Sequence, residues 1–524
     1  MLKTARTLLV ALAVLLTVGC GEEPYDLILQ NGLVLDGTGS EAVQADVGVR
    51  GDRIAAVGDL AGAAAGDVLD VEGLHVSPGF IDLHSHAGGN LSDPELSPAR
   101  ALVAQGITTA VINPDGGGPV DLAAQREGLL RDGLGVNVIQ LVPHASVRSE
   151  VMGGSFDREP TDEEMDEMRR LVRVGMEEGA FGLSTGLFYT PGDFATTQEI
   201  VELAQVVAEF NGVHSSHIRD EADYSVGVVN AVQEIIDISR ESGVAGIVSH
   251  IKALGPNVWG ASEEIVARIA AAREEGVEVW ADQYPYDASA TGLTAALVPA
   301  WARDGGGEEL RRRMEEPETA ERIREGISEN LARRGGADRI MFRGTGELAG
   351  RTLADLAEER GTDGVDAAFQ LIRANEAPGI ISFNMHEDDI HRLMRQPWTL
   401  TSTDGGLPVF GEGTTHPRAY GAFPRKIRKY VREEGVLDLP QAIRTMTGAS
   451  AQAFRVEGRG VIEPGAYADI TVFDLERVHD PADYLDPHQY GEGMVHVLVN
   501  GTFTIRDEAF TDALPGLVLR LGDP

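Results

Sequence analysis

The sequence of 524 residues is poor in cysteine and in lysine. It has a single cysteine, Cys20, and only four lysines, Lys3, Lys252, Lys426 and Lys429. With one cysteine, no disulfide can form within the chain. Acidic residues outnumber basic ones by 83 to 44, which gives a net charge of −39. Because such a surface repels phosphate groups, neither nucleic acids nor anionic lipid surfaces are expected as partners.

The N-terminus has the pattern of an export signal. Lys3 and Arg6 precede an apolar run, residues 7–18, that is too short to cross a membrane and is followed by Cys20. A lone cysteine at this place resembles the lipidation site of bacterial lipoproteins. We therefore predict a lipoprotein-like signal peptide in residues 1–20 and a periplasmic or cell-envelope protein held to the membrane only through Cys20. The alternative is an ordinary export signal with an incidental cysteine.

Short apolar strands separated by turn residues occupy both ends of the chain. In the first of them, Asn31-Gly32 is expected to form a turn between the strands Tyr25–Leu29 and Leu33–Leu35. Strands of the same kind return near the C-terminus. We predict that residues 21–78 and 455–524 together form one small β-sandwich domain.

Residues 79–454 alternate between strands and amphipathic helices, such as Asp162–Glu178 and Ser262–Glu275. This α/β alternation contains eight β units, which favours a (β/α)8 TIM barrel. A doubly wound sheet is the alternative, but it would not bring so many polar strand ends to one point. The alternation breaks at about 286–385, which predicts a mostly helical insertion, and insertions at this face of a barrel often form a lid.

Polar residues of one chemical kind follow the predicted barrel strands. The opening strand runs into His84 and His86, which share one face because residues two apart on a strand do. Two imidazoles there can chelate one ion, and neutral imidazole suits zinc. In a barrel the chemistry sits at the C-terminal strand ends. The other ends supply Asp115, His144, His217, His250, Asp282 with Tyr284, and Asp404.

The surrounding motifs occur in a definite order. They are Gly79-Phe80-Ile81-Asp82-Leu83-His84-Ser85-His86, Gly182–Leu187, Ser216-His217-Ile218-Arg219-Asp220-Glu221, Ser249-His250-Ile251-Lys252, Ser402-Thr403-Asp404-Gly405, His416–Arg418, Phe423–Arg425 and Gly465–Asp469. Together they resemble the amidohydrolase superfamily of metal-dependent hydrolases and, within it, the N-acyl-D-amino-acid deacylases (D-aminoacylases). The resemblance covers roughly residues 26–474.

This resemblance implies a metal site and a catalytic acid. His84, His86 and Asp404 would hold one divalent ion, and His217 and His250 would hold a second or the only tightly bound one. Asp404 would be the general base that activates the metal-bound water and later the acid that protonates the departing amine. A carboxylate suits this role because coordination keeps it ionised until it takes the proton.

One position departs from the family pattern. D-aminoacylases place a cysteine ligand after the second barrel strand, where this chain has Asp115 in a glycine-rich turn. Asp115 is the natural substitute, since a carboxylate is harder than a thiolate and can bridge two metals; the alternative is a simple turn former. As a ligand it would make the site less selective for Zn²⁺, so that Mn²⁺ or Co²⁺ supports activity.

No lysine occurs between His86 and His217. Hydantoinases and dihydroorotases of the superfamily bridge their metals with a carboxylated lysine in this interval, so the sequence argues against those enzymes.

The resemblance also points to a group that holds the substrate's free α-carboxylate, formed by Tyr189, Lys252, Tyr284 and Arg418. A guanidinium fork and phenol hydroxyls suit such an anion. For each of the four, an ordinary structural contact is the alternative. His144 and Asp282 are weaker candidates for residues behind the metal ligands.

The sequence thus predicts a hydrolase that releases a D-amino acid from a small N-acyl-D-amino acid. One alternative is a dipeptidase for peptides with a C-terminal D-residue. Another is a non-catalytic periplasmic binding protein on the same scaffold, against which the intact histidines and Asp404 speak.

Overall fold

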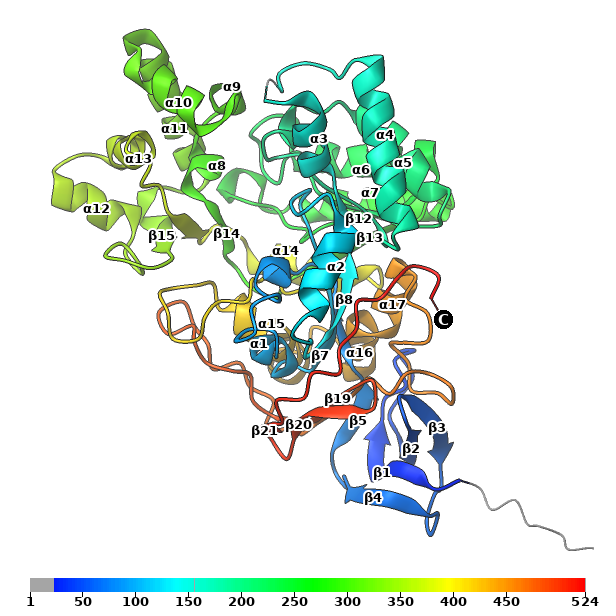
Figure 1. Cartoon of the computed structure of the whole chain (residues 1–524). Helices are drawn as coiled ribbons and strands as arrows, with labels where there is room; N and C mark the ends of the chain where they lie inside the picture. The colour runs from blue at the N-terminus through cyan, green and yellow to red at the C-terminus, as the bar shows by residue number, and fades with distance from the viewer. Residues whose placement is uncertain (1–22, 155, 524) are drawn as a thin grey trace, which may run out of the picture.

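The computed structural model describes residues 23–154 and 156–523 (Figure 1). The predicted export signal, residues 1–20, lies outside this part of the chain. Among the described residues no helix combines the length and the apolar character needed to cross a membrane.

A ring of short parallel strands forms the centre of the molecule. Nearly all of their residues are buried, as expected for strands that are covered on both faces. In chain order the strands are β6 (Phe80–Asp82), β7 (Ile107–Ile112), β8 (Asn137–Gln140) with its continuation β9 (Val142–Pro143), β10 (Gly182–Gly186), β11 (Val213–His217), β12 (Ala245–Val248), β13 (Val279–Gln283) and β17 (Thr399–Thr401).

The ring is closed by its first and last strands. The order β6-β7-β8 continues through β9 into β10-β11-β12-β13-β17. Beyond the end of β17 the Asp404 amide donates to the His84 carbonyl oxygen at 2.9 Å, and the His86 amide donates to the Gly405 carbonyl oxygen at 2.8 Å. The predicted (β/α)8 barrel is therefore confirmed, and its closure lies directly at the histidine pair.

Helices surround the barrel on its outer face (Figure 1). The long α4 begins with a capping box, in which Thr161 and Glu164 satisfy each other's backbone amides, and buries Met165, Met168 and Val172 along one face. The principal helices are α1 (Arg100–Val103), α2 (Leu122–Leu130), α3 (His144–Met152), α4 (Asp162–Glu177), α5 (Thr197–Ala208), α6 (Val228–Ser242), α7 (Ser262–Glu274), α14 (Glu387–Met394), α15 (Arg418–Arg425), α16 (Leu439–Met446) and α17 (Gly448–Phe454). A π-helical segment, Lys426–Glu433, follows α15.

Both ends of the described chain contribute to one nine-stranded sheet, in which β5 lies beside β18. Side chains from β1, β2, β3, β5, β18 and β19 share one buried cluster, so the sheet curves around its own core. The strands are β1 (Tyr25–Val34), β2 (Val43–Arg50), β3 (Arg53–Gly58), β4 (Ala65–Asp70), β5 (His75–Pro78), β18 (Ile470–Phe473), β19 (Met494–Val499), β20 (Thr502–Arg506) and β21 (Ala509–Phe510).

The turn predicted at Asn31-Gly32 is wrong, because β1 runs through these residues as one strand. Its register against β2 shifts between Leu29 and Gly32, which marks a β-bulge. Asn31 takes a φ of 64° there, and its amide donates to an Asp46 carboxylate oxygen at 2.8 Å. The same residue types that favour a turn also favour a bulge, and the sheet partner decides between them.

The region predicted as an insertion forms a unit with its own hydrophobic core, which projects from the barrel at the upper left of Figure 1. It is mostly helical, but it also contains a three-stranded antiparallel sheet in the order β14-β16-β15 that the pattern did not indicate. Its elements are β14 (Ser289–Gly292), α8 (Leu293–Leu297), α9 (Ala300–Arg303), α10 (Gly306–Glu315), α11 (Pro317–Arg333), β15 (Ile340–Arg343), α12 (Leu353–Arg360), α13 (Gly364–Arg373) and β16 (Gly379–Ser382).

Candidate metal centre

The predicted metal ligands lie at or just beyond the C-terminal ends of five barrel strands. His84 and His86 follow β6, and Asp115 lies in the turn after β7. His217 is the last residue of β11, His250 follows β12 and Asp404 follows β17. The barrel therefore brings together residues that are more than three hundred positions apart in the sequence.

Three of these residues have a left-handed backbone. The φ angles are 56° at Asp115, 36° at His250 and 46° at Asp404. Residues other than glycine adopt this conformation at a cost of about 1–3 kcal/mol each, and such positions concentrate at functional sites. All three residues follow the ends of barrel strands, and their side chains belong to the groups that could hold a metal ion.

The carboxylates of Asp115 and Asp404 lie against the histidine pair. The His86 Nε2 is 3.2 Å from the Asp404 Oδ1, and the His84 Nε2 is 3.3 Å from the Asp115 Oδ1. Two atoms bound to one tetrahedral zinc at about 2.0–2.1 Å lie roughly 3.3 Å apart. The separations in this first group therefore fit ligands of one ion.

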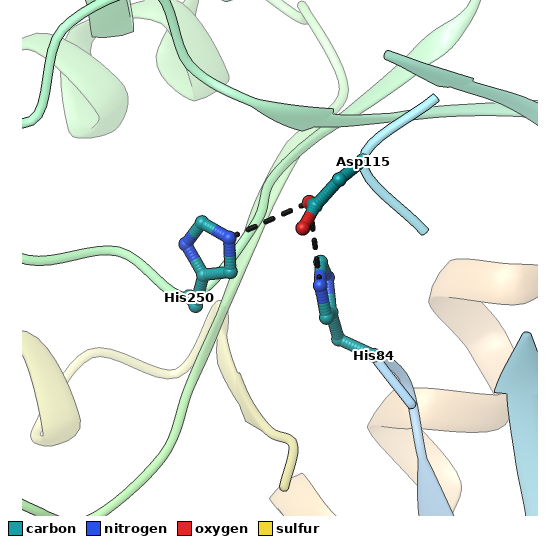
Figure 2. Close-up of side chains that lie close together, drawn as sticks. All are labelled: His84, Asp115 and His250. Carbon is teal, nitrogen blue, oxygen red and sulfur yellow. Dashed lines mark ion pairs between the residues drawn. The ribbon is translucent and has the colours of Figure 1, made fainter. Parts of the chain in front are cut away.

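His217 and His250 form a second group, which shares the carboxylate of Asp115 with the first. The Nδ1 of His217 is 2.9 Å from the Nε2 of His250, and the His250 Nε2 is 3.5 Å from the Asp115 Oδ1. Figure 2 shows the Asp115 carboxylate between the rings of His84 and His250. Asp115 thus faces both groups and could bridge two ions.

A divalent cation fits this cluster for a further reason. The Nε2 of His84 and the Oδ1 of Asp115 are buried, yet neither makes a hydrogen bond with any other described residue. Buried polar atoms are rarely left without a partner, and a cation held between them would satisfy both. The prediction of Asp115 as a ligand in the place of the family's cysteine is consistent with this geometry.

The charges around the cluster keep both carboxylates ionised. Burial alone would raise the pKa of Asp404, but Arg418 and the imidazoles of His250 and His86 hold it well below its usual value. Burial would likewise raise the pKa of Asp115, and His84 and His250 reverse this. Burial lowers the pKa of His217 to about 4. Against the effect of burial, Asp115 and Asp404 raise the pKa of His86 to about 9, and Asp404 and Glu221 raise that of His250 to about 10, so these two imidazoles supply positive charge to the carboxylates where a cation would otherwise do so.

Glu221 is a functional residue that the sequence reasoning did not assign. Its buried carboxylate lies 3.0 Å from the Nδ1 of His250 and forms an ion pair with Lys252. A carboxylate behind a histidine fixes the tautomer and the orientation of the ring, and here it aims Nε2 at Asp115. The sequence offered one signal for this role, which is an acidic residue four positions after His217 in the motif Ser216–Glu221.

Two further carboxylates support the strand ends. Asp82 accepts hydrogen bonds from the amide and the hydroxyl of Thr403 at 2.8 and 2.6 Å. Asp282 accepts from the His250 amide at 3.0 Å, so it positions that residue through its backbone. His144 instead lies 2.9 Å from Glu199 and contacts none of the predicted ligands.

The predicted substrate residues line a cavity of about 920 Å³. The predicted ligands that line the same cavity are His86, Asp115, His217, His250 and Asp404. Arg418 lies 2.8 Å from the Asp404 Oδ2, with its guanidinium carbon 4.7 Å from the centre of the Tyr284 ring. The Lys252 ammonium group contacts Glu221 and lies 2.8 Å from the Nδ1 of His250.

The fourth predicted substrate residue, Tyr189, lies with its ring 4.6 Å from that of His217 and its hydroxyl 3.2 Å from the Thr291 hydroxyl. All four residues therefore meet at the metal centre.

Comparison with known proteins gives a consistent result. The sequence profile of the amidohydrolase family matches residues 67–505. A D-aminoacylase of Alcaligenes xylosoxydans xylosoxydans is 34% identical over 95% of this chain and 98% of its own length.

Two solved structures superpose on nearly the whole chain. An N-acyl-D-glutamate deacylase from Bordetella bronchiseptica, in complex with zinc and a phosphonate that mimics the tetrahedral intermediate, is 35% identical with a TM-score of 0.80 and covers 95% of this chain and all of its own. A D-aminoacylase with a binuclear metal centre is 33% identical, with the same TM-score and coverage.

Proposed function

Because the chain belongs to the amidohydrolase family, in which it groups with the N-acyl-D-amino-acid deacylases, we propose that it removes the acyl group from N-acyl-D-amino acids. It is a metal-dependent hydrolase of linear amide bonds. One observation carries the proposal for this site. The carboxylate of Asp404 contacts the predicted ligand His86 through one oxygen and the cation Arg418 through the other, at the wall of a cavity large enough for such a substrate.

The residues of the centre divide the chemistry between them. His84, His86 and Asp404 would hold one divalent ion, and His217 and His250 a second. Asp115 lies within 4 Å of all four histidines and could serve both ions. Such an ion supplies Lewis-acid activation of water and of the scissile carbonyl. Asp404 accepts the proton of the attacking water and passes it to the amide nitrogen as the carbon–nitrogen bond breaks, which releases a carboxylate and a free amino acid.

Arg418 links substrate binding to this proton transfer. Its guanidinium is paired with Asp404, so an incoming α-carboxylate competes with Asp404 for the same donors. Binding of the substrate therefore releases Asp404 from one of its partners at the moment when it is needed as a base. Tyr284 lies beside the guanidinium and completes the recess for the carboxylate.

A panel of substrates tests the proposal. We expect the zinc-loaded protein to release amine from N-acetyl-D-amino acids and not from their L-enantiomers. Peptides with a C-terminal D-residue belong in the same panel, because hydrolysis of these alone would favour the dipeptidase alternative. A protein that binds no divalent ion and hydrolyses none of the compounds would contradict the proposal.

We also propose that the enzyme is exported and anchored in the cell envelope by a lipid on Cys20. The support is the sequence of residues 1–20, with basic residues, an apolar run and the chain's single cysteine in that order. Expression in a bacterial host with labelled palmitate should label the wild type but not Cys20→Ala, and the variant should leave the membrane fraction. Equal labelling or equal membrane association of the two would refute the anchor.

A further inference from the structure

His416 lies between the helix that carries Arg418 and the first strand of the insertion. It directly precedes Pro417 and α15, whose first residue is Arg418. Its side chain is buried, and the motif His416–Arg418 alone does not show a role for it. Since Arg418 is the cation paired with Asp404, a residue that holds the start of α15 also affects the proposed carboxylate site.

Both ring nitrogens of His416 are bound to backbone atoms. The amide of Arg418 donates to Nδ1 at 3.1 Å, and Nε2 lies 3.0 Å from the carbonyl oxygen of Ala288. Because a backbone amide can only donate, Nδ1 carries no proton, and Nε2 donates to Ala288. Burial lowers the pKa of His416 well below its usual value, and the charge of Arg418 adds to this effect, so the ring stays neutral in this tautomer.

The bond to Arg418 caps α15. Pro417 occupies the N-cap position and makes no side-chain capping hydrogen bond, so the first amides of the helix need acceptors from outside it. The His416 side chain accepts from the amide two positions ahead, as an asparagine does in an Asx turn. Its carbonyl oxygen accepts from the Ala419 amide at 3.2 Å. His416 thus satisfies two of the amides at the start of α15.

The ring of His416 is itself held in place by three tyrosines. The ring centres of Tyr286, Tyr484 and Tyr284 lie 5.1, 5.2 and 6.1 Å from its own, each in an edge-on arrangement. Tyr284 is also the ring beside which the Arg418 guanidinium lies. With these contacts and two hydrogen bonds, the imidazole has a fixed orientation from which it can position Arg418.

The segment that leads into Arg418 is bound to the insertion at two places. Thr414 and Gly344 exchange two backbone hydrogen bonds of 2.8 Å each, and Gly344 directly follows β15. The second place is the bond from His416 to Ala288, which directly precedes β14. The carboxylate site and the insertion therefore meet at His416.

We propose that His416 is a positioning residue for substrate recognition. Anchored at Ala288, it sets the start of α15 and thereby the direction in which Arg418 offers its guanidinium to the substrate's α-carboxylate. The inference rests on the proposed function and adds a residue that is not among the described residues lining the cavity. The alternative is a buried histidine that only stabilises the fold.

Two substitutions separate the two bonds of the ring. In His416→Asn the side-chain oxygen takes the place of Nδ1 and can still accept from the Arg418 amide, but the side chain is too short to reach Ala288. In His416→Gln the side-chain nitrogen takes the place of Nε2 and can still donate to Ala288, whereas the Arg418 amide loses its acceptor.

The measured quantity is the preference for a free carboxylate. It is the ratio of kcat/KM for the N-acetyl-D-amino acid that the wild type hydrolyses fastest to kcat/KM for the C-terminal amide of the same compound. We expect His416→Gln to lower this ratio about tenfold and His416→Asn to stay within about threefold of the wild type. The loss should appear mainly as a higher KM for the free acid. A residue that only stabilises the fold would affect both substrates alike and leave the ratio unchanged.

Two further variants serve as references. Arg418→Met gives the ratio without the cation, and adding His416→Gln to it should lower the ratio no further. His488→Gln is the matched control, because the His488 ring also joins α15 to a loop. It contacts the Tyr420 hydroxyl at 3.0 Å and the Gly413 carbonyl oxygen at 3.1 Å, and neither bond involves Arg418. This variant should keep the ratio of the wild type.

An active His416→Gln variant with the wild-type ratio overturns the inference, as does an equal loss in His488→Gln or a wild type without preference for the free carboxylate. If His416→Gln does not fold, His416→Asn decides, since a ratio as low as that of Arg418→Met would show that the bond to the Arg418 amide does not hold the site. A wild type that hydrolyses no N-acetyl-D-amino acid refutes the proposed function, and the inference with it, which is a separate outcome.

Discussion

The metal centre and the insertion wall, which is formed by Arg334, Arg343 and residues 289–292, line one cavity, yet they are built differently. At the metal centre His250 has the carboxylate of Glu221 behind it, and Asp82 and Asp282 hold the strand ends through backbone amides. At the insertion wall Arg343 and Arg334 have no anionic partner among the described residues. The protein's own carboxylates thus hold the residues that perform the chemistry, whereas the insertion presents to the cavity two cations that no described carboxylate pairs.

The substitution Asp404→Asn is the strongest test of the metal centre. The amide cannot accept the proton of water, so we expect kcat to fall by about 10²–10⁴-fold. Metal content, measured by mass spectrometry, should remain close to that of the wild type because the other ligands stay. Unchanged turnover would remove Asp404 from its role as the base.

Asp115 tests whether the two groups of ligands are one centre. We expect Asp115→Ala to lose metal from both groups and to lower kcat/KM more than the roughly 10- to 100-fold that loss of a supporting residue costs. Asp115→Cys should restore a ligand and shift metal preference toward zinc, because thiolate is the softer donor. Titration with Zn²⁺, Mn²⁺ and Co²⁺ measures both effects. If Asp115→Ala binds metal as the wild type does, the residue is only a turn former.

Much of the metal centre could be predicted from the sequence. Histidines that follow apolar strands mark the barrel mouth, and the helix predicted for 262–275 is found at Ser262–Glu274. The role of Glu221 was not predicted, because it depends on where His250 and Lys252 lie in space. The strands of the insertion were not predicted, since β14 pairs with β16 across about ninety residues and β15 with β16 across about forty, and no local pattern indicates such a pairing.

Glu221→Gln measures how much the support behind a ligand contributes. The amide side chain of this variant would keep the shape but lose the charge that orients His250, and we expect affinity for the divalent ion to fall about tenfold. Glu234→Gln is the matched control. Glu234 is also largely buried and forms an ion pair of 2.8 Å, but its partner is Arg219 and not a predicted metal ligand. An equal loss in both variants would show a general effect of charge instead of positioning.

Lys426 extends the comparison to a buried cation outside the cavity. Its ammonium nitrogen lies 2.7 and 2.9 Å from the hydroxyls of Thr401 and Thr445, and burial lowers its pKa to about 7 from 10.5. Between these two pH values the unfolded chain binds more protons than the folded one, so the stability of the wild type rises with pH.

We therefore expect Lys426→Met to raise the free energy of unfolding on the order of a few kcal/mol at or below pH 7. The gain should shrink toward pH 10, and activity should change little. Denaturant unfolding at several pH values measures this. A gain that does not vary with pH would mean that packing, and not the charge, is responsible.

A carboxylate ligand at position 115 would also change how the centre responds to oxidants. The chain's only sulfhydryl group belongs to Cys20, far outside the barrel in sequence. Peroxide converts a reactive thiolate into sulfenic and then sulfinic acid, whereas it leaves a carboxylate unchanged. With Asp115 as the ligand that we predict, the centre would coordinate its ions through oxygen and nitrogen alone, and we expect it to keep working in peroxide where a thiolate-ligated centre would be inactivated.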